Sequence, residues 1–464
     1  MLPDLTTLSH RLRHGSLTAA ALVDGCLDAI GDPAGEGPRA FWSVARARAR
    51  ATAAAVDTAR AGGGLLPHLA GLPVAVKDLF DVEGEVTTAG STVLAGEAPA
   101  AVTAPAVRRL VAAGLIPIGR TAMTEFAFSG LGLNAHHDTP ASSWGRARSR
   151  RIPGGSSSGS AVAVADGMAP VGLGTDTGGS CRIPAAFNGL VGWKPTADRV
   201  PLDGVLPLAP SLDSVGVMAA SVDDCVTLDA VLAGIDPGRR TTVDERPPSR
   251  IRLAAVVDLV LDDLDPHVAA VHEHSLALLR AAGVTVTEVG FPELLDLPAI
   301  NAGGGLAAAE AYRWHRPLLA RAAAGYDPRV RARIEAGAAL DAAAVLDAQA
   351  GRRRLRAAAE RRLAGFDAVV LPTVAITAPT IASFAAGDAD TAAAYYSATN
   401  LLCLRNTSVA NMLDGCAITI PAPVGDDAPV GCMLMGRHGT DRALLGLART
   451  VAAVLGDDAA GVSR

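Results

Sequence analysis

Helix-like and strand-like segments alternate along most of this 464-residue chain, and this alternation restricts its possible folds more than any other feature. LPVAVKDLF (residues 72–80) and LIPIG (115–119) are short apolar runs typical of buried strands, and TAPAVRRLVAAG (103–114) between them has helical spacing. Further segments continue the alternation: strand-like 251–260, helical 265–283, strand-like 284–290, 367–372 and 429–436, and helical 441–456. Units of this size predict an α/β fold with a mainly parallel sheet covered by helices on both faces.

Other helical segments indicate one continuous domain rather than separate modules. Ser16 is the predicted cap of a helix over residues 16–30, and residues 41–61 predict a second helix that ends at a run of three glycines. A long helical pattern runs from Val330 to Leu363, and its arginines indicate either an anion or RNA contact or, as we favour, a solvated helix face. Because no internal repeat and no long low-complexity linker is present, we expect one domain over residues 1–464.

Charge and composition argue against several functional classes. The chain has 41 Lys and Arg against 47 Asp and Glu, so its net charge of −6 lacks the positive excess of most nucleic-acid binders. Six cysteines form no CxxC pair, which argues against a zinc ribbon or a disulfide scaffold. The N-terminal residues lack a secretory apolar region, and no stretch approaches the ~18 apolar residues of a membrane span. We therefore expect a cytoplasmic protein.

The most informative stretch, residues 153–196, holds two clusters of glycine and serine. Neither cluster completes a GxxxxGK[ST] or GxGxxG phosphate-binding pattern. Residues 155–159 match the GxSxG of a histidine-triad esterase, with Ser157 at the centre. A nucleophile elbow follows an apolar strand, however, and the residues before this match are polar and cationic. We therefore consider acyl chemistry that does not use histidine.

Lys77 is the candidate base for such chemistry. A serine hydroxyl needs a base within hydrogen-bond reach, and a buried lysine gives up its charge more readily than an exposed one. Lys77 lies in the strand-like segment 72–80, where an interior lysine is costly unless it is neutral or paired. A lysine at a strand end that reaches solvent is equally compatible with this segment taken alone.

The second cluster, TDTGGS at residues 175–180, has the composition of an oxyanion-binding loop. Gly178 and Gly179 permit backbone conformations in which successive N–H groups converge on a developing negative charge. An ordinary turn is the more common outcome for such a segment in isolation.

Taken together, Lys77, GGSS at 154–157 and GTDTGGSCRIPA at 174–185 resemble the amidase signature family of Ser–Ser–Lys hydrolases. The spacing between Ser156 and Ser180 also agrees with that family. The core of the resemblance runs from about Leu69 to Met218, and weaker similarities follow at 371–373, 405–415 and 429–436. The resemblance implies a single large α/β domain with a central mixed, mainly parallel β-sheet covered by helices on both faces.

The resemblance also implies a role for each residue of these motifs. Ser180 would be the nucleophile that forms an acyl-enzyme. Ser156, joined to Gly155 by a cis peptide bond, would pass the proton of Ser180 to a neutral Lys77. The remaining implied residues are the oxyanion-hole amides of Thr177, Gly178, Gly179 and Ser180, and Asp176 and Arg182, which support the loop or touch the substrate. For Asp176 and Arg182 we expect support.

The chain departs from the family pattern in two places. Cys181 replaces an aliphatic residue, and we expect it to be a small buried apolar side chain. Residues 134–138 differ from the usual family loop, so the substrate cannot be inferred from this loop by resemblance. His136 and His137 are a conceivable metal pair, but adjacent side chains without a third ligand rarely converge. We therefore expect a surface loop there and no metal.

The implied activity is hydrolysis of a linear carboxylic amide, with a small molecule as substrate and no cofactor, nucleic acid or membrane as partner. A homodimer is compatible with the resemblance. The main alternative is the amidase (glutaminase) subunit of a tRNA-dependent amidotransferase, against which the net charge and residues 134–142 weigh modestly. A Ser157 esterase and a binding protein with a decayed site are two further alternatives.

Overall fold

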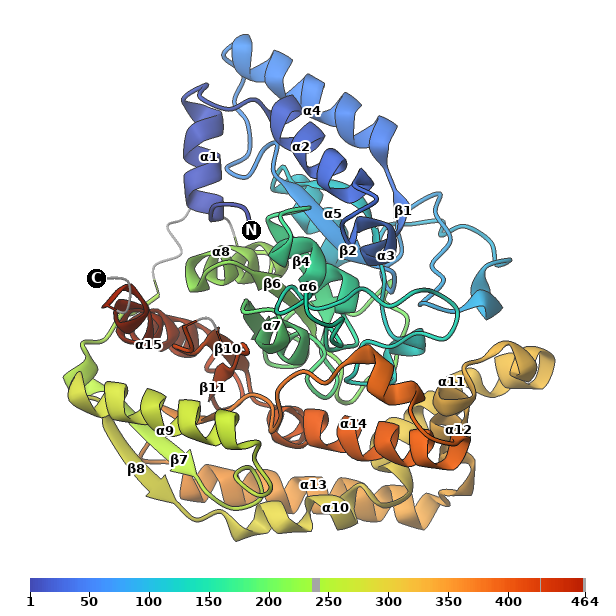
Figure 1. The fold of residues 1–464 in the computed structure, drawn as a ribbon, viewed down its shortest axis with the longest axis vertical. Helices are drawn as coiled ribbons and strands as arrows, with labels where there is room; N and C mark the ends of the chain where they lie inside the picture. The colour runs from blue at the N-terminus through green and yellow to red at the C-terminus, as the bar shows by residue number, and fades with distance from the viewer. Residues whose placement is uncertain (236–242, 426, 462–464) are drawn as a thin grey trace.

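The apolar run that contains Lys77 forms β2, a strand whose residues are all buried within a large sheet. In the computed structural model, which describes residues 1–235, 243–425 and 427–461, eleven strands form this sheet (Figure 1). Their spatial order is β1-β3-β2-β4-β6-β5-β10-β11-β9-β7-β8. The strands are β1 (Phe41–Val44), β2 (Pro73–Lys77), β3 (Ile116–Thr121), β4 (Val171–Thr175), β5 (Val191–Lys194), β6 (Val215–Ala219), β7 (Arg252–Val256), β8 (Thr285–Val289), β9 (Ala368–Pro372), β10 (Ala417–Pro421) and β11 (Gly431–Met435).

Strand directions in this sheet are mixed. Among the described residues, four of the ten strand pairs are parallel: β2 with β3 and with β4, and β7 with β8 and with β9. The other six are antiparallel. The predicted α/β class and mixed sheet are confirmed, but the parallel pairs are not the majority that we predicted. The reason is that β5, β6 and β10, which the sequence pattern did not reveal, occupy the middle of the sheet and pair only antiparallel.

Helices cover the sheet on both faces. The α-helices of the described residues are α1 (Leu5–Arg13), α2 (Ala19–Gly31), α3 (Gly37–Ala40), α4 (Arg46–Ala61), α5 (Pro105–Ala112), α6 (Ser158–Ala165), α7 (Arg182–Phe187), α8 (Val222–Leu232), α9 (Pro266–Ala281), α10 (Leu297–Ile300), α11 (Gly305–Ala322), α12 (Pro328–Glu335), α13 (Ala342–Arg362), α14 (Ala389–Met412) and α15 (Asp441–Gly461). One series in contact consists of α6, α7 and α14, and a second consists of α5, α8, α15 and α9. Both series pack on strands of the sheet.

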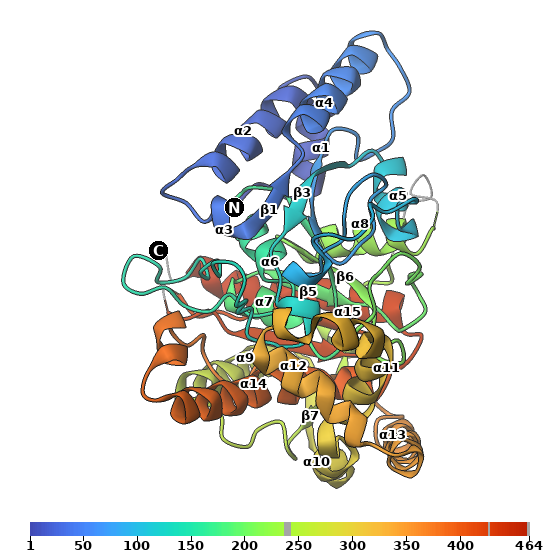
Figure 2. The ribbon, with the colours of Figure 1, turned by 90° about the vertical axis from the view of Figure 1, so that its right-hand side faces the viewer.

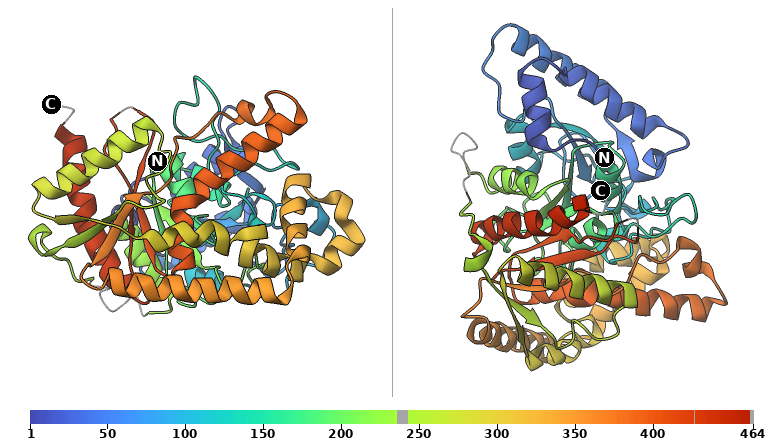
Figure 3. Two further views of the ribbon diagram at one scale, coloured as in Figure 1. Left: turned by 90° about the horizontal axis from the view of Figure 1, so that it is seen from below. Right: turned by 60° about the vertical axis from the view of Figure 1, so that its left-hand side comes forward.

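The two ends of the molecule have different helices. Figure 1 shows α1, α2 and α4 at one end and α10 and α13 at the other. Figure 2 and the right-hand view of Figure 3 show the same separation. Between these ends, α11, α12 and α14 lie in the same half of the molecule. Their position matters below, because α12 and α14 contribute to the cavity beside the second glycine–serine cluster.

The N-terminal region differs from the sequence prediction in two details. The side chain of Thr18, not that of Ser16, caps α2 by accepting a hydrogen bond from the backbone N–H of Ala21. Residues Phe41–Val44, predicted as the start of a helix, form β1 and pair with β3. Helical spacing alone misassigned them, because pairing with β3 is a contact between residues far apart in the sequence. The helix that follows, α4, ends at Gly62 as predicted.

The long helical pattern from Val330 to Leu363 is interrupted in the structure. It divides into α12, a short 3₁₀ turn over Ala336–Ala339, and α13, which begins after the capping residue Asp341. One of the arginines near its end, Arg352, donates to the backbone oxygens of Ser211, Asn411 and Met412. These contacts occupy Arg352, and whether the other arginines form a solvated helix face or an anion or RNA contact stays a prediction. Among the described residues, no helix is both long and apolar enough to cross a membrane.

Candidate active site

Lys77 and Thr175 meet at one edge of the sheet. Each is the last residue of its strand, and β2 and β4 are parallel neighbours. Because the carboxyl ends of parallel neighbours lie at the same edge, the fold brings these two side chains together. Lys77 Nζ lies 2.8 Å from Thr175 Oγ1 and 2.8 Å from Ser156 Oγ. The Lys77 side chain is fully buried, so the alternative of a lysine that reaches solvent is wrong.

Burial also controls the charge of Lys77. It lowers the pKa of this amine from its ordinary value near 10.5 to about 8, although Cys181, Asp213 and Asp176 act in the opposite direction. Within the described residues no carboxylate lies within 4 Å of the amine, and its hydrogen-bond partners are two hydroxyl groups. An amine with this pKa is partly neutral near pH 7, and its lone pair can then accept a proton from Ser156.

Ser156 reaches Lys77 from the segment that precedes α6. This helix packs on β2 and β4, which places its N-terminal end near the carboxyl ends of these strands. The peptide bond between Gly155 and Ser156 is cis, as the resemblance implied. Gly155 has no room for a side chain, because an added Cβ would lie 2.5 Å from the backbone nitrogen of Gly132. The Ser156 side chain is fully buried and faces the amine rather than solvent.

Ser180 lies in the loop after β4, in the wall of a cavity of about 460 Å³. The backbone oxygen of Ser180 accepts a hydrogen bond from the N–H of Ser157 at 3.3 Å, and this bond joins the two glycine–serine clusters. In the part of the chain that the structure describes, no hydrogen bond joins the hydroxyls of Ser156 and Ser180. The proton relay between these two serines therefore stays a prediction.

Three of the four backbone amides predicted for the oxyanion hole are free to donate a hydrogen bond to a ligand. Among the described residues, the N–H groups of Thr177, Gly178 and Ser180 make no hydrogen bond within the protein, and all three residues line the cavity. Gly179 differs from the prediction, because its N–H donates to Asp176 Oδ1 at 2.8 Å and is not free for an oxyanion. The structure thus gives Gly179 a part in shaping the loop instead.

The backbone at Gly179 requires glycine for two reasons. Its φ of +137° lies in a region that other residues rarely adopt, and an added Cβ would lie 2.2 Å from Thr407 Oγ1. That threonine hydroxyl donates to the backbone oxygen of Gly178 at 2.6 Å. The close approach of α14 therefore helps to hold the loop conformation that exposes the neighbouring amides to the cavity.

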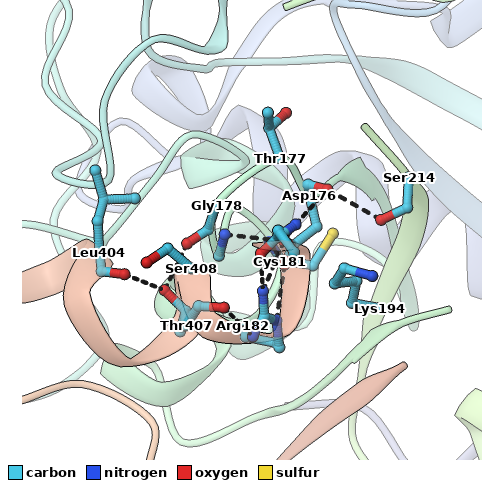
Figure 4. Close-up of polar contacts among 12 residues, drawn as sticks. Asp176, Thr177, Gly178, Cys181, Arg182, Lys194, Ser214, Leu404, Thr407 and Ser408 are labelled. Atoms are coloured by element: carbon cyan, nitrogen blue, oxygen red, sulfur yellow. Dashed lines mark hydrogen bonds and ion pairs between the residues drawn. The ribbon is translucent and has the colours of Figure 1, made fainter. Parts of the chain in front are cut away.

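Asp176 and Arg182 form a buried pair beneath this loop (Figure 4). Arg182 donates from Nε to Asp176 Oδ2 at 3.0 Å and from Nη2 to Oδ1 at 2.8 Å, a two-pronged contact. Asp176 also accepts from the N–H groups of Gly179 and Cys181. Burial alone would raise the pKa of Asp176, but Arg182 overrides this effect and lowers it to about 2. Neither side chain lines the cavity, which is the arrangement expected for loop support.

Thr177 is anchored by a second buried acid. Its hydroxyl donates to Asp213 Oδ1 at 2.5 Å, and Asp213 Oδ2 accepts from the backbone N–H groups of Leu208 and Ala209. Burial raises the pKa of Asp213, against the effect of these hydrogen bonds. The loop that follows β4 is thus held by Asp176 on one side and Asp213 on the other.

Sequence reasoning missed several residues that contribute to the site. Thr175 belongs to the TDTGGS motif, and its position at the end of a short apolar run was an available signal. Arg333 of α12 and Arg405 of α14 line the cavity with Asn400, although no motif marks them. They come from helices far apart in the sequence, so only the tertiary structure reveals that they share a cavity with Ser180.

The remaining residues that the sequence singled out make structural contacts. Ser157, the centre of the GxSxG match, is fully buried and donates to the backbone oxygen of Thr175 at 3.4 Å. Cys181 is fully buried, and burial raises the pKa of its thiol to about 12. His136 contacts buried Glu125 at 2.7 Å, and His137 packs on Trp42. No cluster of three or more His, Cys, Asp or Glu suited to a metal ion occurs among the described residues.

Comparisons with known proteins agree with this fold. The model of the Amidase family matches residues 33–445. The 2-amino-5-chloromuconic acid deaminase of Comamonas testosteroni is 37% identical over 451 residues, covering 96% of this chain and 95% of that protein. A glutamyl-tRNA(Gln) amidotransferase subunit of Symbiobacterium thermophilum is 34% identical, covering 94% of this chain and 93% of that protein. A crystal structure of an amidase is similar with a TM-score of 0.87 and 32% identity, covering 98% of this chain and 100% of that chain.

Proposed function

Because this chain belongs to the Amidase family, we propose that it hydrolyses a linear carboxylic amide through an acyl-enzyme formed on Ser180. The observation that carries the proposal is the contact between the fully buried amine of Lys77 and the hydroxyl of Ser156. Burial lowers the pKa of Lys77 to about 8, which suits it to accept protons near neutral pH. Ser180 lies in a cavity wall, where a substrate carbonyl can approach it.

In the proposed first step, neutral Lys77 accepts the proton of Ser156, and Ser156 accepts the proton of Ser180 as Ser180 Oγ bonds to the carbonyl carbon. The carbonyl π electrons move to oxygen, and the free amides of Thr177, Gly178 and Ser180 stabilise the resulting oxyanion. When the C–N bond breaks, Lys77 returns its proton through Ser156 to the leaving nitrogen. The products of this step are an ester on Ser180 and free ammonia or amine.

In the second step, water replaces the amine. Lys77, acting through Ser156, removes a proton from the water as its oxygen bonds to the ester carbon. The bond between this carbon and Ser180 Oγ then breaks, and the proton returns to Oγ. The carboxylic acid leaves and the enzyme is restored, so the balanced reaction consumes one amide and one water.

The test uses Ser180→Ala and a panel of primary amides, anilides, esters and ureas, read by release of ammonia or amine. We expect Ser180→Ala to abolish turnover, and wild-type enzyme to show an added acyl mass in intact-protein mass spectrometry when it is quenched during turnover of an activated ester. Ser157→Ala is the matched control and should stay within a few-fold of wild type. Full amide hydrolysis by Ser180→Ala, or loss of it in Ser157→Ala, would refute the assignment.

A second candidate is the glutaminase subunit of a tRNA-dependent amidotransferase. The 34% identity with a protein of that name over nearly the whole chain favours it. The two functions differ in what the purified chain does by itself. An independent amidase releases ammonia from small amides without a partner, whereas the amidotransferase component would hydrolyse glutamine only with its partner chains present. We propose the independent enzyme, acting in the cytoplasm on a small molecule without nucleic acid or membrane, and static light scattering would decide between a monomer and a homodimer.

A further inference from the structure

The charged side chains in the wall of the cavity beside Ser180 are all positive. Its wall includes two arginines, Arg333 and Arg405, and no Asp or Glu. A half-buried guanidinium without a carboxylate partner is unusual, because removing a charge from water costs free energy that a counter-ion normally offsets. Among the described residues, neither arginine has a carboxylate oxygen within 4 Å. The cavity therefore holds two cations that no acid of its own wall neutralises.

Arg333 is held in place by contacts that leave its charge unpaired. Its Nη1 donates to the backbone oxygen of Phe128 at 2.5 Å, and its guanidinium lies over the Phe128 ring, 4.6 Å from the ring centre. One turn earlier on α12, Arg329 does pair with an acid, Asp327, at 2.7 Å. On the same short helix, therefore, an acid pairs with Arg329 but, among the described residues, none pairs with Arg333.

Arg405 is fixed in a similar way from α14. Its Nε donates to Asn406 Oδ1 at 3.0 Å, and its Nη2 donates to the backbone oxygen of Val260 at 3.2 Å. Both partners are neutral. Asp262 and Asp263 act on this arginine electrostatically but make no ion pair with it. One turn further along α14, Ser408 lines the same cavity, and Thr407 supports the loop of Ser180.

We propose that the cavity binds amides that carry a carboxylate, and that Arg333 and Arg405 select these substrates by pairing with that carboxylate. The inference rests on the proposed function for the chemistry at Ser180, but the binding of the anion does not depend on it. Ser180 and its free amides would hold the amide end, while the arginines hold the acid end. A guanidinium with unused N–H groups suits a carboxylate, which accepts two hydrogen bonds in one plane. The cavity volume of about 460 Å³ suits a small molecule.

The first test compares substrates of matched length on the wild-type enzyme. Succinamic acid and glutaramic acid carry a carboxylate, whereas 4-hydroxybutanamide and 5-hydroxypentanamide replace it by a neutral alcohol, and 4-aminobutanamide replaces it by a cation. We expect kcat/KM for the better acid to exceed that of its alcohol partner by roughly ten- to hundredfold, as for one or two charge-assisted hydrogen bonds. Equal values for acid and alcohol, or a preference for the cation, would overturn the proposal.

The second test removes the charges one at a time. Arg405→Gln and Arg333→Gln should each raise KM for the acid about tenfold or more and leave kcat/KM for the alcohol within a few-fold. Arg405→Lys and Arg333→Lys keep the charge and should recover part of the loss, which a purely structural defect would not allow. Arg353→Gln is the matched control, because this arginine is exposed on α13 outside the cavity wall. If the glutamine variants lost kcat/KM for the acid and for the alcohol equally, selection by charge would be contradicted.

Calorimetry separates this inference from the proposed function. Succinate and glutarate are titrated into Ser180→Ala and into the same protein with Arg405→Gln or Arg333→Gln. Arginine-dependent binding without any amide hydrolysis by the wild type would leave the inference standing and reject the proposed function. Amide hydrolysis by the wild type, with dicarboxylate binding that is absent or insensitive to both arginines, would reject the inference alone.

Discussion

The pH dependence of the reaction gives the most direct test of Lys77 as the base. Burial lowers the pKa of Lys77 from near 10.5 to about 8. At pH 7, an amine with a pKa of 8 is neutral in about one molecule in ten, whereas an amine with a pKa of 10.5 is neutral in about one in 3,000. The buried site therefore raises the reactive fraction about 300-fold at pH 7. Since only the neutral form can accept a proton, the rate should follow that fraction.

The assay measures kcat/KM for amide hydrolysis between pH 5 and pH 9.5. We expect kcat/KM to rise about tenfold per pH unit up to pH 7 and to level off above about pH 8, because the pKa of Lys77 is about 8. The variant Lys77→Met keeps an unbranched side chain without the amine. Its kcat/KM should be about 10²–10⁴-fold lower than that of the wild type, and the rising limb of the pH profile should disappear. A solvent viscosity series on the wild type establishes that chemistry, not substrate encounter, limits the rate.

Lys194 provides a demanding control for this experiment. It is also buried, and burial lowers its pKa to about 8, so it would titrate over the same range. Its Nζ, however, donates to the backbone oxygens of Pro195 and Gly415, both at 2.7 Å, and not to a serine. Lys194→Gln keeps N–H donors for these two carbonyls and should keep the rising limb. If the limb persisted in Lys77→Met or disappeared in Lys194→Gln, the assignment of the base to Lys77 would be refuted.

Three further predictions concern the loop after β4. Gly179→Ala places a Cβ 2.2 Å from Thr407 Oγ1 and should lower both the free energy of unfolding, by about 1–3 kcal/mol, and kcat, measured by urea unfolding and ammonia release. Arg182→Met leaves Asp176 charged and buried without its partner, so urea unfolding should report a loss of about 3–5 kcal/mol, and a loss under 1 kcal/mol would contradict the support role. Ser157→Ala removes a long hydrogen bond, 3.4 Å to the backbone oxygen of Thr175, and should change stability by less than about 1 kcal/mol, measured the same way.

The residues of the site could be predicted from the sequence as far as local patterns reach. The apolar run before Lys77 indicated a buried strand, and the resemblance of the two glycine–serine clusters to the amidase signature motifs singled out Ser156 and Ser180. Such features depend on neighbours a few positions away, so a single sequence contains them. The α/β class followed in the same way from the lengths and spacings of apolar runs.

Predictions failed where the outcome depends on a partner distant in the sequence. Phe41–Val44 form a strand because β3 is available to pair with them. Antiparallel strand pairs are the majority because β5, β6 and β10 lie in the middle of the sheet. Gly179 belongs to the predicted loop, but its N–H is held by the carboxylate of Asp176. That hydrogen bond depends on the folded path of the loop, which the residue types do not specify.

The sequence alone therefore determined the class of fold and the chemical groups available for catalysis. The tertiary structure decided how those groups are charged and what surrounds them. Lys77 has a pKa of about 8 because segments far apart in the chain exclude water from it. Arg333 and Arg405 share a cavity with Ser180 because α12 and α14 pack in the same half of the molecule. Solvent exclusion and convergence are properties of packed elements, so they exist only once the chain has folded.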